Sequence, residues 1–233
     1  STQRERSQIW SEVIAYEIGK VSGVPVPPAF LAMNSATGEV GVLIEFFFGH
    51  PGYLGPDRFI HAIDRFQAFN IEIDLKRGSL KENIVLTRAH SIPNWRSWWA
   101  QTITFDALIS NGDRHSENWG FMVERTAAGE TGYTLAPAFD NGSSLGWQIA
   151  DAQLRDHLAS PKLGTYLDKG RHHYGWVGGD HSDAGHAALC GKFLTMYGSC
   201  RDVMERVVSF SDSDLEEIIA RMSLFAFPAP FVG

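Results

Sequence analysis

The chain of 233 residues carries a formal net charge of −7, and 44% of its residues are hydrophobic. This length suits one large domain or two closely packed lobes, and this apolar fraction can supply a sizeable core. The acidic balance argues against nucleic acid as the main ligand, so we expect no direct binding of DNA or RNA.

The sequence favours the cytoplasm and gives no sign of a membrane segment. Two cysteines, Cys190 and Cys200, do not indicate a disulfide framework, which favours a reducing compartment. The first ten residues, STQRERSQIW, have no apolar stretch of the kind found in signal peptides. The longest apolar run, residues 40–49, is interrupted by Glu45 and is too short to span a bilayer.

The first third of the chain predicts one helix and two strands. Apolar residues recur at helical spacing over residues 7–22, which predicts a helix. The proline-rich stretch VPVPPAFLAM, residues 24–33, predicts an extended edge strand. The turn formers SATGE follow, and VGVLIEFFF, residues 40–48, predicts a buried strand. We therefore expect the two strands to be joined by a hairpin-like turn.

Helices dominate the rest of the chain. Phenylalanine and isoleucine at spacings of three or four predict a helix over residues 57–73. Residues 94–110 are apolar on nearly every side, which predicts a helix at the centre of a helical lobe. The last predicted helix begins at SDSDLEEII, where Ser211 or Ser213 can cap it and the acidic first turn suits the helix dipole.

Two polar clusters flank a predicted hairpin of the strands WGFMVER and YTLAPAF. NGDRHSEN, residues 111–118, precedes the hairpin, and FDNGSS, residues 139–144, follows it. The hairpin should bring Asp113, Asn118 and Asp140 close together. Carboxylate and amide oxygens are suited to Mg²⁺ or Mn²⁺ with phosphate completing the shell. Alternatively, Asp113 takes the proton of a hydroxyl nucleophile while Asn118 and Asp140 hold the metal. Phosphoryl transfer requires both roles.

The spacing of these residues sharpens the prediction. Protein kinases carry an aspartate, an asparagine five residues later, a hairpin, and then an Asp-Phe-Gly turn. Asp113 and Asn118 keep the five-residue step, and Asp140-Asn141-Gly142 stands where Asp-Phe-Gly would be. Either cluster alone would be read as a solvated loop of turn formers. The two together, in this order, favour a kinase.

ISNGDRHSENWGFM followed by YTLAPAFDNGSSLG resembles the HipA family of serine/threonine kinases, the toxins of bacterial toxin–antitoxin modules. SEVIAYEIGKVSGVPVPPAFL is similar to that family's helix that begins with glutamate and ends in Gly-x-Pro-Val-Pro, and VLIEFF is similar to its hinge strand. The resemblance covers residues 7–150. Phosphatidylinositol kinases share an Asp-Arg-His-x-x-Asn loop, so a lipid or small-molecule kinase is the related alternative.

The resemblance implies an α+β, protein-kinase-like bilobal fold with a truncated N-lobe and a mainly helical C-lobe. The N-lobe would be residues 1–48, a helix with antiparallel strands and the hinge. The C-lobe would be residues 49–233, with the catalytic loop and the metal-binding turn. The implied activity is phosphorylation of a serine or threonine on a cytoplasmic protein, with ATP as co-substrate, Mg²⁺ or Mn²⁺ as cofactor, and an antitoxin protein as a possible partner.

Catalytic roles follow from the resemblance residue by residue. Asp113 would be the catalytic base, and Asn118 and Asp140 would hold the metal. His115 would lie near the phosphates, or orient the loop through hydrogen bonds. Glu117 stands where many relatives have lysine, and a negative charge there would disfavour phosphate if it pointed inward.

Nucleotide-binding roles are implied for the first lobe. Glu12 would pair with the ATP-binding lysine, with an ordinary surface carboxylate as the alternative. The backbone of Glu45, Phe46 and Phe47 would face adenine. The eleven residues before Glu12 contain neither the family's Gly-rich loop nor its lysine. We expect an upstream segment or a partner chain to supply them, or the protein to be a pseudokinase-like binding module, and we expect little turnover from this chain alone.

A histidine- and glycine-rich segment covers residues 170–186, GRHHYGWVGGDHSDAGH. Its histidines and aspartates are conceivable zinc ligands, but the spacing of His181 and His186 does not suit one helical face, and no cysteine joins them. We therefore expect a glycine-rich surface loop. Contact between a substrate and Arg171 or the histidines is the alternative.

Overall fold

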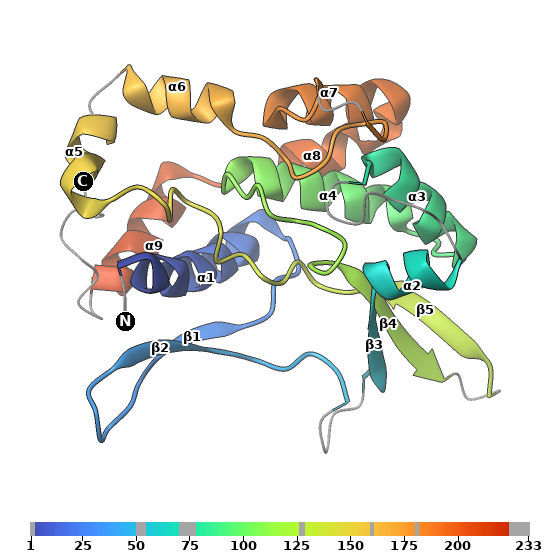
Figure 1. Ribbon diagram of the computed structural model, residues 1–233, viewed down its shortest axis with the longest axis horizontal. Helices are drawn as coiled ribbons and strands as arrows, with labels where there is room; N and C mark the ends of the chain where they lie inside the picture. Colours follow the sequence, from blue (N-terminus) through green and yellow to red (C-terminus); the bar gives the residue numbers. More distant parts are fainter. Residues whose placement is uncertain are drawn as a thin grey trace.

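The computed structural model describes residues 3–49, 55–69, 78–125, 129–158, 161–179 and 182–223, which form two small sheets beside a group of helices (Figure 1). The strands are β1 (Ala29–Met33), β2 (Val40–Ile44), β3 (Arg58–His61), β4 (Gly120–Arg125) and β5 (Thr131–Leu135). The helices are α1 (Gln3–Ser22), α2 (Ala62–Ala68), α3 (Leu80–Ala89), α4 (Trp95–Leu108), α5 (Asp151–Leu158), α6 (Lys162–Lys169), α7 (His186–Met196), η1 (Gly198–Cys200), α8 (Arg201–Val207) and α9 (Asp212–Ser223). None of the helices in the described ranges is long and apolar enough to cross a membrane.

Helix α4 lies at the centre of the helices, as its sequence predicted. Trp99 and Ile103 are fully buried in a core cluster that also contains Trp119 next to β4 and Phe193 of α7. Phe105, on another side of α4, belongs to a second core cluster. A helix that is apolar on most sides can be buried on most sides, which explains why two cores meet on α4.

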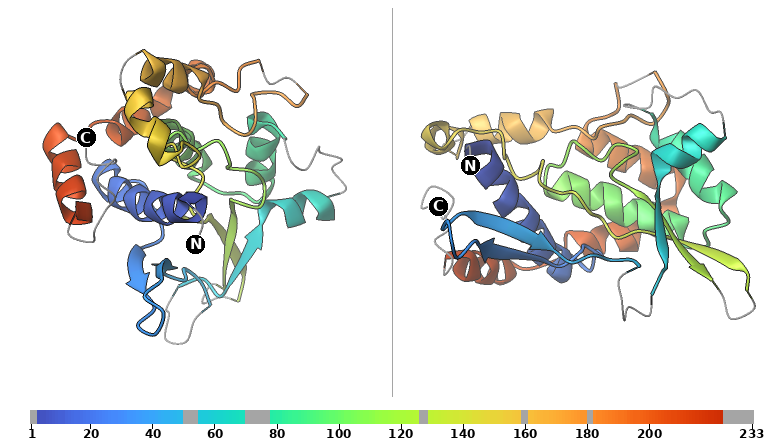
Figure 2. Two further views of the ribbon diagram at one scale, coloured as in Figure 1. Left: turned by 60° about the vertical axis from the view of Figure 1, so that its left-hand side comes forward. Right: turned by 60° about the horizontal axis from the view of Figure 1, so that its bottom comes forward.

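The second core cluster joins the first helix to the last ones. It contains Trp10 and Ile18 of α1 together with Val207 of α8 and Ile218 of α9. Helix α1 also contacts both the β1–β2 hairpin and α9, and the three lie close together (Figure 2). The division of the chain into lobes at residues 48 and 49 stays a prediction.

The β1–β2 hairpin is confirmed, but the prediction that residues 40–48 form a buried strand is wrong. Strands β1 and β2 pair antiparallel around a turn in which Gly38 has a φ of +71°. In a two-stranded sheet alternate side chains face opposite sides, and one side here packs into the core beside α1. Leu31 and Val42 pack on that side. The paired Phe30 and Leu43 lie on the opposite side and are exposed, although the Phe30 ring still meets Tyr16 of α1 edge-on, with 6.0 Å between the ring centroids.

The start of the predicted helix over residues 57–73 is a strand. Arg58–His61 forms β3 and pairs antiparallel with β4, and the helix α2 begins only at Ala62. Residues 70–73 lie outside the described residues. A Cβ atom at Gly120 of β4 would overlap the carbonyl oxygen of Ile60, so this glycine allows β3 to approach. Pairing with a strand distant in the sequence thereby overrides the helical spacing.

Two further predictions about elements hold. Strands β4 and β5 form the predicted hairpin and complete a sheet in the order β3–β4–β5. At the start of α9, Ser211 is the cap: its Oγ accepts from the backbone nitrogen of Asp214 at 3.2 Å. The Asp214 carboxylate accepts in return from the backbone nitrogen of Ser211 at 2.8 Å, which completes a capping box.

The described residues between α6 and α7 form a loop, as predicted for residues 170–186, but the prediction that this loop lies on the surface is wrong for several of its residues. His172, Tyr174 and Trp176 are buried, and the two aromatic residues belong to the core cluster of α4. Residues 177–179 are exposed. The prediction of a surface position relied on the glycines of the segment. Its large aromatic side chains, however, are stabilised by burial of their apolar area in the core.

Candidate active site

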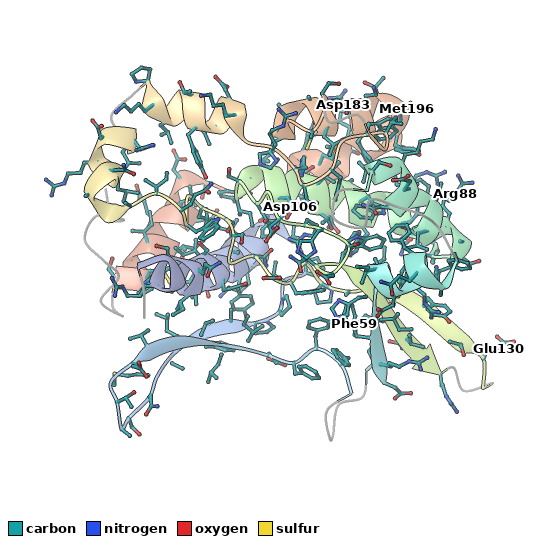
Figure 3. The ribbon with its side chains drawn as sticks, viewed as in Figure 1. Phe59, Arg88, Asp106, Glu130, Asp183 and Met196 are labelled. Carbon is teal, nitrogen blue, oxygen red and sulfur yellow. The ribbon has the colours of Figure 1, made fainter. Side chains whose placement is uncertain are left out.

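Two loops that carry the predicted site residues meet beside the end of α4. The Asp113 loop is residues 111–118, between α4 and β4, and the Asp140 turn is residues 139–144, after β5. Asp106 of α4 lies near the centre of the molecule (Figure 3). Its carboxylate is fully buried and accepts hydrogen bonds from Arg114 and Asn111 of the Asp113 loop.

Arg114 ties α4 to both loops. Its buried guanidinium binds Asp106 through two contacts, Nη2–Oδ1 at 2.7 Å and Nε–Oδ2 at 3.2 Å. It also donates to Asn141 Oδ1 at 2.7 Å and to the carbonyl oxygens of Asn118 and Phe139. Burial disfavours the charge on Arg114, but the neighbouring Asp106 carboxylate outweighs it and raises the arginine's pKa. The signal for this network in the sequence is Asp106, an aspartate within an otherwise apolar helix, and no role was predicted from it.

The backbone of Asp113 is fixed from several sides, which leaves its carboxylate available. Asn111 donates to Asp106 Oδ1 at 3.1 Å and accepts from the backbone nitrogen of Asp113 at 3.0 Å. The Asn118 amide nitrogen donates to the Asp113 carbonyl oxygen at 2.8 Å, and the backbone nitrogen of His115 does the same. The Asp113 side chain is 46% exposed, so solvent or a substrate can reach it.

The Asp140 turn adopts a backbone that aspartate tolerates better than most residues. Asp140 has a φ of +56°, in the left-handed region, and strain of this kind clusters at functional sites. The next residue, Asn141, is buried and donates to the Ala138 carbonyl oxygen at 2.9 Å. The backbone nitrogen of Gly142 donates to Glu12 Oε1 at 2.8 Å. Hydrogen bonds therefore hold the turn on both sides of Asp140. Asp140 itself is exposed.

Glu12 is buried against the Asp140 turn, so the alternative of an ordinary surface carboxylate is wrong. Its side chain is 9% exposed, and the neighbouring Ser11 Oγ donates to the Ser144 carbonyl oxygen at 2.9 Å. Burial, with repulsion from Asp140, raises the pKa of Glu12 to about 7. Pairing of Glu12 with a lysine stays a prediction.

Glu12→Gln should stabilise the protein at pH 8 but not at pH 4. The unfolded carboxyl ionises near 4.5 and the folded one near 7. Between these values the folded state holds a proton that the unfolded chain has released, so the free energy of unfolding falls as pH rises. The loss is complete above pH 7 and amounts to about 3 kcal/mol, because each pKa unit is worth about 1.4 kcal/mol.

Urea unfolding of wild type and Glu12→Gln between pH 4 and 8, with EDTA present, measures this difference. Glu216→Gln, the same change at an exposed position of α9, is the control and should leave the pH profile as in wild type. Parallel profiles for wild type and Glu12→Gln would show that the pKa of Glu12 is not raised.

A cavity of about 700 Å³ brings five predicted site residues together. It lies between α1, the end of β2, the start of α2 and the two loops. The predicted residues that line it are Glu12, Phe47, His115, Asn118 and Asp140. Glu45 and Phe46 are exposed and do not line it, so the role of their backbone as a hinge stays a prediction.

The cavity also has lining residues that the sequence analysis missed. His61, at the end of β3, has its Nδ1 2.7 Å from the Glu117 carbonyl oxygen, and Asp64 of α2 adds a carboxylate to those of Glu12, Glu117 and Asp140. His61 was missed because residues 57–73 were predicted to form a single helix. In the structure His61 lies at the junction of β3 and α2, from which its ring reaches the Asp113 loop. The Glu117 carboxylate lies at the open side of this cavity, 62% exposed and 3.6 Å from His115 Nδ1.

Asn118 and Asp140 form a donor set that fits Mg²⁺. The Asn118 amide nitrogen is used in its bond to Asp113, which leaves the amide oxygen as the group that can face a cation. Mg²⁺ needs only one or two protein carboxylates, because water and phosphate oxygens complete its shell. Within the described ranges, no three or more His, Cys, Asp and Glu side chains form a metal-binding group. Asp180 and His181, which belong to the zinc alternative, lie outside those ranges.

A second cavity, of about 460 Å³, adjoins the Asp113 loop. Asp113 lines this cavity and not the first one. The other lining residues come from the Asp140 turn and the segment after it, from α6 and the residues that follow it, and from the start of α7. The predicted base and the predicted metal ligands thus face two different cavities.

The chain is similar to one protein family and to two solved structures. A model of the HipA-like C-terminal domain family matches residues 2–176. The crystal structure of a Helicobacter pylori proinflammatory kinase, CtkA, is similar with a TM-score of 0.71 at 20% identity, over 92% of this chain and 75% of that one. HipA from Shewanella oneidensis MR-1, in a complex with HipB and its operator DNA, aligns with a TM-score of 0.37 at 15% identity, over 90% of this chain and 52% of that one. No curated protein sequence matches the chain. The similarity to CtkA confirms the predicted α+β, truncated kinase-like fold.

Proposed function

The chain belongs to the HipA-like C-terminal domain family, and from this membership we propose that it transfers the γ-phosphoryl group of ATP to a serine or threonine hydroxyl of a protein. The observation that carries the proposal is that the predicted metal ligands and the predicted base line two different cavities. Asn118 and Asp140 face the larger one, and Asp113 faces the other beside it. A phosphotransferase needs separate access for nucleotide and acceptor, with a base on the acceptor side.

In the proposed reaction ATP occupies the larger cavity. The acceptor hydroxyl binds Asp113, which takes its proton and later passes it to solvent. A bond forms between the hydroxyl oxygen and the γ-phosphorus while the bond to the bridging oxygen of ADP breaks. Asn118 and Asp140 would hold Mg²⁺, which would neutralise charge on the phosphates. Arg114 keeps the two loops in register, because it is hydrogen-bonded to both.

Membership of the family extends the proposal to the biological setting. We place the protein in the cytoplasm as the toxin of a toxin–antitoxin module, with an antitoxin protein as its partner. We assign His115 a position near the phosphates, an assignment supported by its lining the same cavity as Asn118 and Asp140. Its backbone and ring contacts also help to shape the Asp113 loop.

Titration of the protein with ATP, with and without Mg²⁺, tests the nucleotide and metal assignments. The protein should be expressed with any residues that precede Ser1 in its gene. Wild type should bind ATP at least tenfold more tightly with Mg²⁺, and Asp140→Ala should lose that increase, because the carboxylate that holds the ion is gone.

Asp64→Ala is the control, since Asp64 is another carboxylate of the same cavity that is not assigned to the metal. It should retain the effect of Mg²⁺. Loss of the Mg²⁺ effect in Asp64→Ala but not in Asp140→Ala would contradict the metal site. A wild type that binds no ATP with any metal would instead support a binding module.

A further inference from the structure

We propose that the cavity beside Asp113 binds the acceptor segment of the protein substrate and selects one with a carboxylate close to its hydroxyl, held by Lys169 and Arg171. The inference rests on the proposed function, because it assigns the acceptor side of the same reaction. It goes further by stating the chemistry of the preferred substrate, which is an acidic segment.

The position of Asp113 identifies this cavity as the acceptor side. Asp113 lines the 460 Å³ cavity, whereas Asn118 and Asp140 line the other one. A hydroxyl that is to lose its proton to Asp113 must approach through the cavity that this carboxylate faces. The groups around that cavity therefore meet the residues next to the hydroxyl.

The charges around the cavity favour an anionic group. Lys169 and Arg171 line it, and Asp113 is the one carboxylate among its described lining residues. The Lys169 ammonium forms no ion pair within the described part of the chain. A local positive site in a chain of net charge −7 attracts anions selectively, because its surroundings repel them. A carboxylate also matches the planar fork of an arginine.

Close backbone packing holds this positive site against the Asp113 loop. A Cβ atom at Gly112 would lie 2.9 Å from the Arg171 carbonyl oxygen, so only glycine lets the two segments approach this closely. Gly170 likewise leaves room for the His186 ring, whose Cδ2 would lie 2.7 Å from a Cβ atom there. The backbone nitrogen of His186 donates to the Gly170 carbonyl oxygen at 3.0 Å. In Figure 1 the end of α6 accordingly lies near the end of α4.

His186 supplies a separate indication that the cavity takes a polar ligand. Its side chain is only 8% exposed, yet neither ring nitrogen has a hydrogen-bond partner among the described residues. Buried polar groups are rarely left unpaired, so a ligand group or water is expected beside this ring. Burial lowers the pKa of His186, which keeps the ring neutral at pH 7 and leaves Lys169 and Arg171 as the cations.

Binding of paired peptides in the absence of ATP tests the proposal. One fluorescent peptide carries a serine followed by three aspartates, and its partner carries three asparagines of nearly the same shape. Fluorescence anisotropy should show at least about tenfold tighter binding of the aspartate peptide, since charge-assisted hydrogen bonds are roughly twice as strong as neutral ones. Equal affinity for the two peptides would overturn the proposal.

Charge reversal assigns the preference to the two side chains. Lys169→Glu and Arg171→Glu should each remove most of the preference, and the double variant should favour the asparagine peptide, because carboxylates would then repel carboxylates. Lys162→Glu, on the same helix but not in the cavity, is the matched control and should bind as wild type does. An unchanged preference in both cavity variants would overturn the assignment.

Failure of the acidic-segment site and failure of the proposed kinase function give different results. A preference for aspartate that depends on Lys169 and Arg171, without phosphoryl transfer, would keep the acidic-segment site and reject the kinase. Phosphoryl transfer without any preference would keep the kinase and reject the site. Both measurements use the same protein, and the melting temperature of each variant confirms that it is folded.

Discussion

Asp113→Asn should lower the rate of phosphoryl transfer by about 10²- to 10⁴-fold, the contribution of a positioned general base. Asparagine keeps the shape of the side chain and one carbonyl acceptor but cannot take the proton of the hydroxyl. The loop should stay intact, because its hydrogen bonds use the backbone of Asp113 and not its partly exposed carboxylate. The measurement is transfer of labelled γ-phosphate to an accepted protein substrate, with the melting temperature as a check on folding.

Asp140→Asn provides the comparison for this experiment. It should also lower activity, but through metal binding, so raised Mg²⁺ or Mn²⁺ should restore part of the rate. Asp113→Asn should not respond to the metal. Full activity in Asp113→Asn at an unchanged melting temperature would remove Asp113 from the reaction.

Arg114→Met should destabilise the protein by about 3–5 kcal/mol, the usual cost of leaving one partner of a buried ion pair uncompensated. Asp106 would keep a buried negative charge, and Asn141 and two carbonyl oxygens would lose a donor. Urea unfolding at pH 7 measures the loss. Lys162→Met, which breaks an exposed ion pair with Asp156, should change stability little.

The double variant Arg114→Met with Asp106→Leu separates the two causes of this loss. If the uncompensated charge dominates, the double variant should be more stable than Arg114→Met alone, because no buried charge remains. If the hydrogen bonds to the loops dominate, removing Asp106 as well should bring no recovery. A loss below about 1 kcal/mol in Arg114→Met would show that the network is not the anchor of the site.

The part of the site that could be predicted from the sequence is the part set by local spacing. Asp113 and Asn118 belong to one loop, and a hairpin with turn formers at its tip leads from this loop to Asp140. Helix α4 was predictable because nearly every side of it is apolar. These features depend on residues close in the sequence, and short-range patterns specify them well.

The features that escaped prediction depend on contacts between distant residues. Strand β3 pairs with β4, whereas the sequence of residues 57–73 taken by itself carries helical spacing that begins at Phe59. Glu12 is buried because the Asp140 turn, far along the chain, packs on α1. The cations Lys169 and Arg171 reach Asp113 only because Gly112 permits close packing of two segments. None of these approaches leaves a periodic signal in the sequence.

The core that α1 shares with α8 and α9 has a consequence for the order in which the protein can fold. Glu12 lies on a helix that is made before both loops of the site, whereas Ile218 and Arg221, which pack on and pair with that helix, follow them in the chain. During synthesis the apolar face of α1 therefore stays without these partners until α8 and α9, far along the chain, have left the ribosome. Contacts of such long sequence separation form slowly, because a long loop must close first. The wall of the site that carries Glu12 is accordingly completed late, so a nascent chain that already contains both loops still lacks the assembled site.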